Sequence, residues 1–183
     1  DVAGWMGGIM GQQVQFPLEA GNKRPSIWDV TLDRGYWMVG GQSKPGGKPA
    51  YWAGVIPNGA ATASTVYQAH SFQVSAVASS TVGDLAASAD TFGEIHVWNR
   101  NTGKRLHRFK SLSQKLYEAS FDAGGTRIAY GNANYRGTDY KRNHFGAADF
   151  VFDLAQRTIG ESRFVQGLTP QVERPQVGQY AID

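Results

Sequence analysis

The chain has 183 residues, 41% of them hydrophobic, which is enough for one globular domain with a sizeable core. Its 18 Lys and Arg against 15 Asp and Glu give a net charge of +3 with no run of five like charges, which disfavours nucleic acid as a partner. Without cysteine there are no disulfides and no thiol catalysis. No apolar run is long enough to span a bilayer, so no membrane partner is expected, and no signal-peptide pattern is visible; the compartment stays unknown.

Apolar stretches of strand length begin near the N-terminus. Residues 4–10 and 13–18 predict two strands with a glycine turn between them. The next strands are expected at Ile27–Asp33, Tyr36–Gly40 and Ala50–Ile56, and the last of these contains Trp52.

The segment that starts at residue 27 recurs twice. Segments starting at residues 74 and 116 can be laid on it without gaps, and each is followed by a turn and a second strand. A repeat at this spacing predicts a fold made of one supersecondary unit used several times.

The middle copy, Ala69–Leu106, is the clearest. It predicts four short strands separated by turn signals, with His70 near its start and Trp98-Asn99 near its end. In its third strand Ile95 and Val97 point to one face, while Glu94, His96 and Trp98 point to the other.

These residues resemble a WD40 repeat, which has a Gly-His near its start and a Trp-Asp at the end of its third strand. The resemblance implies a structural tetrad of hydrogen-bonded side chains inside the blade, carried by His70, Ser88, Asp90 and Trp98. Two departures stand out: Asn99 replaces the usual Asp, and Asp90 lies two residues further from Trp98 than is usual in the family.

The resemblance implies an all-β fold, a WD40-like β-propeller, with three recognisable four-stranded blades and partial blades at both ends. The blades are expected at residues 26–68, 70–109 and 115–167, with outer strands of a preceding blade at 1–20 and a tail or the start of a next blade at 168–183. We expect a segment of a larger propeller, whose remaining blades would be partners of this chain. Alternatively, the N-terminal strands pair with the C-terminal segment and close a four-bladed ring.

The outer copies keep less of the signature. Phe152 takes the place of the tryptophan in the third copy, which has no histidine matching His70. Trp52 lies out of register with Trp98, so we expect its loss to destabilise the fold less.

An insertion between the second and third strands of the third copy is the candidate partner-binding loop. It mixes basic and aromatic side chains, which are common at interface hot spots and also stack on bases. The alternative is a solvated loop whose aromatic residues fold back on the blade. Its candidate contact residues are Tyr135, Arg136, Tyr140, Lys141, Arg142, His144 and Phe145.

No catalytic constellation is evident. His70, Ser88 and Asp90 offer the groups of a hydrolytic triad, but nothing resembles a nucleophile elbow or an oxyanion site. Glu94 and His96 share a strand face, yet two ligands without a third are a weak metal signal. The sequence therefore predicts no enzyme, no cofactor and no metal.

The expected function is a non-catalytic scaffold or interaction module that presents loops and ring faces to protein partners. One alternative is the non-catalytic propeller part of a larger enzyme whose active site lies outside this chain. A weaker alternative is nucleic-acid binding through residues 135–146.

Overall fold

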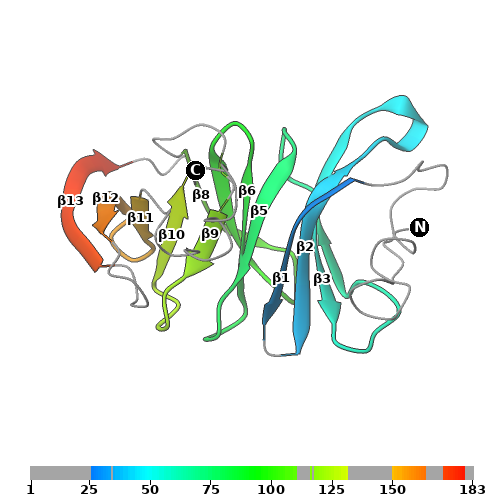
Figure 1. Ribbon diagram of the computed structural model, residues 1–183, viewed down its shortest axis with the longest axis horizontal. Helices are drawn as coiled ribbons and strands as arrows, with labels where there is room; N and C mark the ends of the chain where they lie inside the picture. Colours follow the sequence, from blue (N-terminus) through cyan, green and yellow to red (C-terminus); the bar gives the residue numbers. More distant parts are fainter. Residues whose placement is uncertain are drawn as a thin grey trace, which may run out of the picture.

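The computed structural model describes residues 26–33, 35–110, 116, 118–131, 150–163 and 171–179 (Figure 1). Within them the chain forms strands and a short 3-10 turn at Pro45–Gly47, which confirms the predicted all-β class. None of the described residues forms a helix with the length and apolar character that a bilayer crossing requires.

The strands pair in chain order into three antiparallel sheets. The first sheet contains β1 (Ser26–Asp33), β2 (Tyr36–Ser43), β3 (Ala50–Pro57) and β4 (Thr65–Tyr67). The middle sheet contains β5 (Val74–Ser79), β6 (Leu85–Asp90), β7 (Glu94–Asn99) and β8 (Arg105–Lys110). The third contains β9 (Glu118–Phe121), β10 (Arg127–Gly131), β11 (Phe150–Asp153), β12 (Thr158–Arg163) and β13 (Gln171–Gln179).

In the first sheet, β3 pairs with β2 so that Trp52 faces Gly41 and Ile56 faces Trp37. Trp98 occupies the position in the middle sheet that corresponds to Ile56. Trp52 therefore lies out of register with Trp98, yet its side chain is completely buried in an apolar cluster with Ile56. Because the Trp52 side chain is completely buried, we now expect its replacement by alanine to cost as much stability as that of Trp98, and not less.

The middle sheet is buried on both faces. Trp98, Val74 and Val77 pack toward the first sheet, and another set of apolar side chains packs toward the third. Strand β6 is rich in alanine, and Ala86, Ala87 and Ala89 are fully buried. Small side chains on this strand leave room for the large aromatic residues of its neighbours to fill the layers.

The third sheet differs from the expected four-stranded blade with a separate tail. Residues 171–179 form a fifth strand, β13, which pairs antiparallel with β12. Strand β13 contains Pro175, and a proline is tolerated on an edge strand, where its missing N–H is not needed. Pro175 lies opposite Gly160 at this edge, next to a shift in register.

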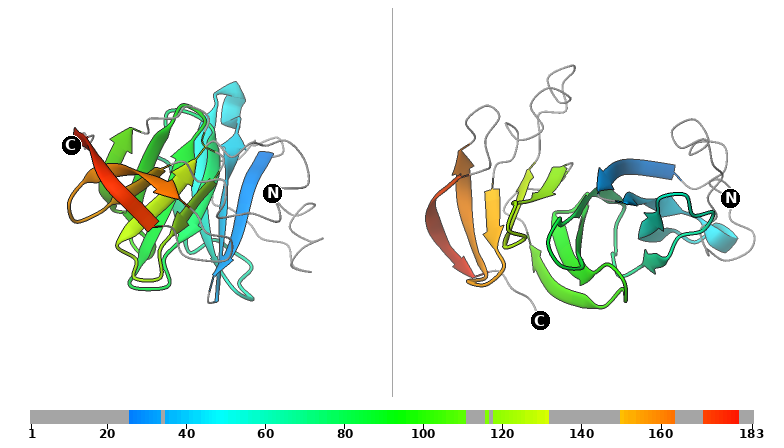
Figure 2. Two further views of the ribbon diagram at one scale, coloured as in Figure 1. Left: turned by 60° about the vertical axis from the view of Figure 1, so that its left-hand side comes forward. Right: turned by 90° about the horizontal axis from the view of Figure 1, so that it is seen from below.

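Strand β5 joins the three sheets, because it lies against β1 and β2 on one side and β9 on the other (Figures 1 and 2). The backbone N–H of Val77 donates to Asp29 Oδ2 of β1 across 2.7 Å. Burial raises the pKa of Asp29 to about 6. Gly40 of β2 packs so closely that a Cβ there would lie 2.8 Å from methyl groups of Val74 and Val77, so a larger residue would push the sheets apart.

Asn99 closes the turn after β7. Its Oδ1 accepts hydrogen bonds from the N–H groups of Asn101 and Thr102, at 3.0 and 2.9 Å. Asp153 does the same after β11, where its Oδ1 accepts from the N–H groups of Ala155 and Gln156. The amide oxygen of Asn99 thus supplies the acceptor that an aspartate supplies in the third sheet.

Candidate functional site

A chain of buried side chains runs through the middle sheet. The Trp98 indole N–H of β7 donates to Ser88 Oγ of β6 across 3.1 Å. Ser88 Oγ lies 2.7 Å from Nε2 of His70, which stands in the connection between β4 and β5. His70 Nδ1 faces Asp90 Oδ2 at 3.4 Å. The structure therefore brings together the four residues named for the tetrad.

The proton positions follow from what each group can do. Because the Asp90 carboxylate only accepts, His70 carries a proton on Nδ1, and its Nε2 accepts from the Ser88 hydroxyl. Burial alone would raise the pKa of Asp90, but the hydrogen bonds from His70 and from the N–H of Glu94 outweigh it and hold the pKa below its ordinary value.

Asp90 also shapes the turn between β6 and β7. Its Oδ1 accepts from the N–H groups of Phe92 and Glu94, at 2.9 and 3.0 Å. The same carboxylate thus links the His70 connection to the turn that carries Phe92. The unusual spacing of Asp90 from Trp98 leaves it within reach of both.

A second histidine extends the cluster, and sequence reasoning had considered it only as a weak metal ligand. His96 of β7 stacks on His70, with ring centroids 4.1 Å apart and planes 14° from parallel. Its Nδ1 lies 2.8 Å from the hydroxyl of Tyr67, at the end of β4, and its Nε2 lies 3.1 Å from Glu94 Oε2. Tyr67 in turn stacks on Trp98. The position of Tyr67, three residues before His70, was the only sequence signal for it.

Near neutral pH the imidazole of His96 is neutral and the hydroxyl of Tyr67 keeps its proton. Burial, then the neighbouring His70 and the guanidinium groups of Arg105 and Arg108, lower the pKa of His96 to about 2. Burial raises the pKa of Tyr67 to about 12. Neither group changes protonation near neutral pH, so this pair is suited to holding strands together and unsuited to general acid–base catalysis.

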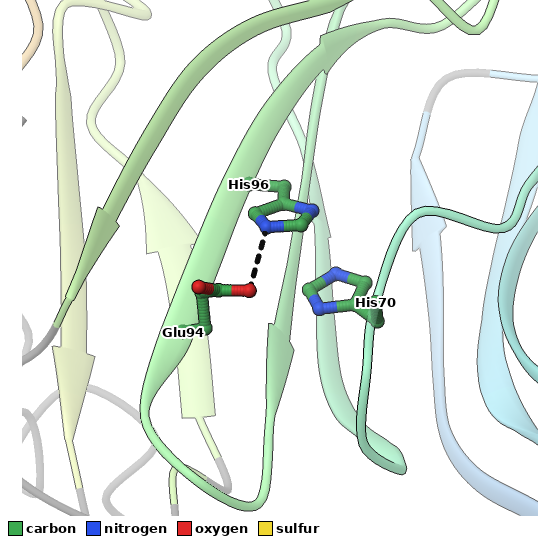
Figure 3. Close-up of side chains that lie close together, drawn as sticks. All are labelled: His70, Glu94 and His96. Atoms are coloured by element: carbon green, nitrogen blue, oxygen red, sulfur yellow. Dashed lines mark hydrogen bonds and ion pairs between the residues drawn. The ribbon is translucent and has the colours of Figure 1, made fainter. Parts of the chain in front are cut away.

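His70, Glu94 and His96 place potential ligand atoms within 4.8 Å of one another (Figure 3). Glu94 and His96 project from β7, and His70 faces them from the adjoining connection. Their donors and acceptors already match one another and the surrounding side chains, and ligand lone pairs in two nearly parallel rings do not converge on one ion. Arg108 Nε also lies 2.8 Å from Glu94 Oε1, which disfavours a second cation there. The geometry fits a hydrogen-bonded network better than a metal centre.

Two exposed phenylalanines lie beside this network. Phe72 follows His70 by two residues and Phe92 follows Asp90 by two. Their side chains are stacked with ring centroids 3.9 Å apart, yet the residues are 40% and 51% exposed. Sequence reasoning missed this pair because the contact joins two separate turns. The loop predicted to bind partners, residues 135–146, lies outside the described residues.

The fold was compared with those of solved structures. The chain is similar to the β-propeller domain of Cps50 (Swd1) from Myceliophteria thermophila, with a TM-score of 0.52 and 14% sequence identity. The match covers 74% of this chain and 38% of that one. The fold is a β-propeller. No protein-family model and no curated protein matches the sequence.

The first two blades of the propeller are joined by Arg100, which follows β7. Its guanidinium donates to Ser79 Oγ at 2.8 Å and lies 4.6 Å from the ring centroid of Tyr36 in the first blade. It also approaches Asp33 of the first blade to 3.8 Å. These contacts tie the turns at one end of the two blades together, while the His70 network organises the turns at the other end.

Proposed function

We propose that this propeller is a protein-interaction module of the WD40 type, with no catalytic chemistry in the described residues. The observation that carries the proposal is the exposed Phe72–Phe92 pair on two turns that a buried network holds in place. The resemblance of His70, Ser88, Asp90 and Trp98 to the family's tetrad supports the finer assignment.

The chemistry of the pair supports a protein partner. Aromatic side chains dominate interface hot spots, because they bury a large apolar area with few rotatable bonds. Exposed apolar side chains that contact each other mark interaction sites more often than single exposed side chains do. Because Asp90 and His70 already fix the two turns, a partner that covers the pair orders little further chain on binding.

The proposal is tested with the double variant Phe72→Ser/Phe92→Ser. The matched control is Leu32→Ser/Val82→Ser, which removes two exposed apolar side chains at the opposite ends of the strands. Proteins that cross-link to the wild-type chain are identified, purified and titrated against all three forms by calorimetry.

We expect the phenylalanine variant to weaken binding of a purified partner by about tenfold or more, which corresponds to about 1.4 kcal/mol. The control should bind as the wild type does. If every purified partner binds both variants with wild-type affinity, the aromatic pair is not the interaction surface and the proposal fails.

A further inference from the structure

The outer strand of the middle blade, β8, is an edge strand among the strands that the structure describes. Strand β8 is the last strand of its sheet. It pairs with β7, and no other strand of the described chain pairs with it. In the third blade the corresponding strand, β12, accepts β13 as an additional antiparallel strand. The same blade architecture in this chain therefore accommodates a fifth strand at its outer edge.

The edge at β8 is strongly basic. Residues 104–110 contain four cations and no acidic residue. Lys104, Arg105 and Lys110 are exposed. Arg108 pairs with Glu94 and remains partly exposed. Leu106 lies among them and is 44% exposed, so the edge offers an apolar contact as well as positive charge.

Charge on an edge strand usually prevents pairing with another copy of the same strand. Two β8 strands side by side would oppose like charges, and directly opposed like charges destabilise a strand pair. An acidic strand meets no such repulsion, and each of its carboxylates would lie near a cation. The basic composition of β8 therefore favours the addition of a negatively charged strand.

We propose that the free edge of β8 is a docking site for an extended acidic peptide segment of a partner protein, which adds as a fifth strand to the middle blade. Main-chain hydrogen bonds to β8 supply affinity. Arg105, Arg108 and Lys110 lie opposite Trp98, His96 and Glu94 and so share one face, where they select acidic residues at alternate positions. Leu106 is the extra residue of a bulge between Arg105 and His107. The edge adjoins one phenylalanine-bearing turn, because Lys110 Nζ donates to the Phe92 carbonyl. The test therefore includes the Phe72→Ser/Phe92→Ser variant, which keeps that carbonyl and removes only the aromatic rings.

The test uses a blocked peptide of alternating glutamate and valine, about six residues long to match the strand. Fluorescence anisotropy measures its affinity for the full chain. A second peptide has the same sequence with alternate backbone nitrogens methylated, which keeps the charge but removes ladder hydrogen bonds on one edge. A lysine–valine peptide and a single-stranded oligonucleotide complete the set of probes.

The variant Lys104→Glu/Lys110→Glu reverses two exposed charges at the ends of β8. Lys44→Glu/Lys48→Glu, between β2 and β3, makes the same change in net charge elsewhere. We expect the acidic peptide to bind the wild type and the Lys44→Glu/Lys48→Glu control alike, and the β8 variant at least tenfold more weakly. The methylated and lysine peptides should bind at least tenfold more weakly to the wild type. The Phe72→Ser/Phe92→Ser variant should bind the acidic peptide as the wild type does.

Three results would overturn the proposal. Equal binding of the methylated peptide would mean that charge alone attracts the probe without strand addition. Equal weakening by the two charge-reversal variants would mean that the attraction is not located at β8. Tighter binding of the oligonucleotide, with the same sensitivity to the β8 variant, would assign the basic edge to nucleic acid.

Discussion

Replacing His70 by alanine removes the centre of the buried network. Ser88 loses the acceptor 2.7 Å from its hydroxyl, Asp90 loses the imidazole that faces its Oδ2, and His96 loses the ring stacked on it. An unsatisfied buried polar group costs about 1–3 kcal/mol, and the imidazole also leaves a cavity. We therefore expect His70→Ala to lower the free energy of unfolding by about 3 kcal/mol. For a chain of this size that corresponds to a fall in melting temperature of about 6–12 °C.

Urea unfolding followed by tryptophan fluorescence measures the loss. The control is His107→Ala on β8, since His107 is half-buried and lies opposite Val97, outside this network; it should cost less than about 1 kcal/mol. If the two variants lose the same small amount, the network does not stabilise the blade and the reasoning from its hydrogen bonds is refuted.

Three further predictions concern the two buried tryptophans, Asp29 and the histidine–glutamate cluster. Trp98→Ala and Trp52→Ala should each cost about 3–5 kcal/mol in urea unfolding, because both side chains are fully buried; a difference between them above about 2 kcal/mol would contradict this. The pKa of Asp29 is raised to about 6 in the folded state, so its contribution to stability is present at low pH and is lost as the pH rises through 6. The wild type should therefore gain about 1.4 kcal/mol relative to Asp29→Asn between pH 8 and pH 5, and equal pH profiles would show that the pKa of Asp29 is not raised in the folded state. Added Zn²⁺ should leave the melting temperature unchanged, since the histidine–glutamate cluster already satisfies its own donors and acceptors; a rise of several degrees would identify a metal site instead.

Most of the fold could be predicted from the repeat pattern in the sequence. Alternating residues bounded by glycine turns give strands wherever one face is buried, and three aligned copies require sheets that stack on one another. The position of β13 could not be predicted in this way. Its proline looks like a break in the sequence, and only the place of β13 at a sheet edge makes Pro175 compatible with a strand.

The site was less accessible to sequence reasoning. His70, Ser88, Asp90 and Trp98 were found through the resemblance to a repeat, which fixes their spacing. The contact of His96 with Tyr67 was not, because Tyr67 comes from the preceding blade and the pairing depends on how two sheets pack. The same holds for the exposed aromatic pair, whose two members stand in separate turns.

The central claim is that the buried network holds the two phenylalanine-bearing turns as one rigid surface. Hydrogen exchange of the Phe92 and Glu94 amides tests it most directly, since both donate to Asp90 Oδ1. These amides should exchange slowly in the wild type and much faster in His70→Ala under conditions where both proteins are folded. Fast exchange in the wild type, or identical rates in the two proteins, would contradict the claim.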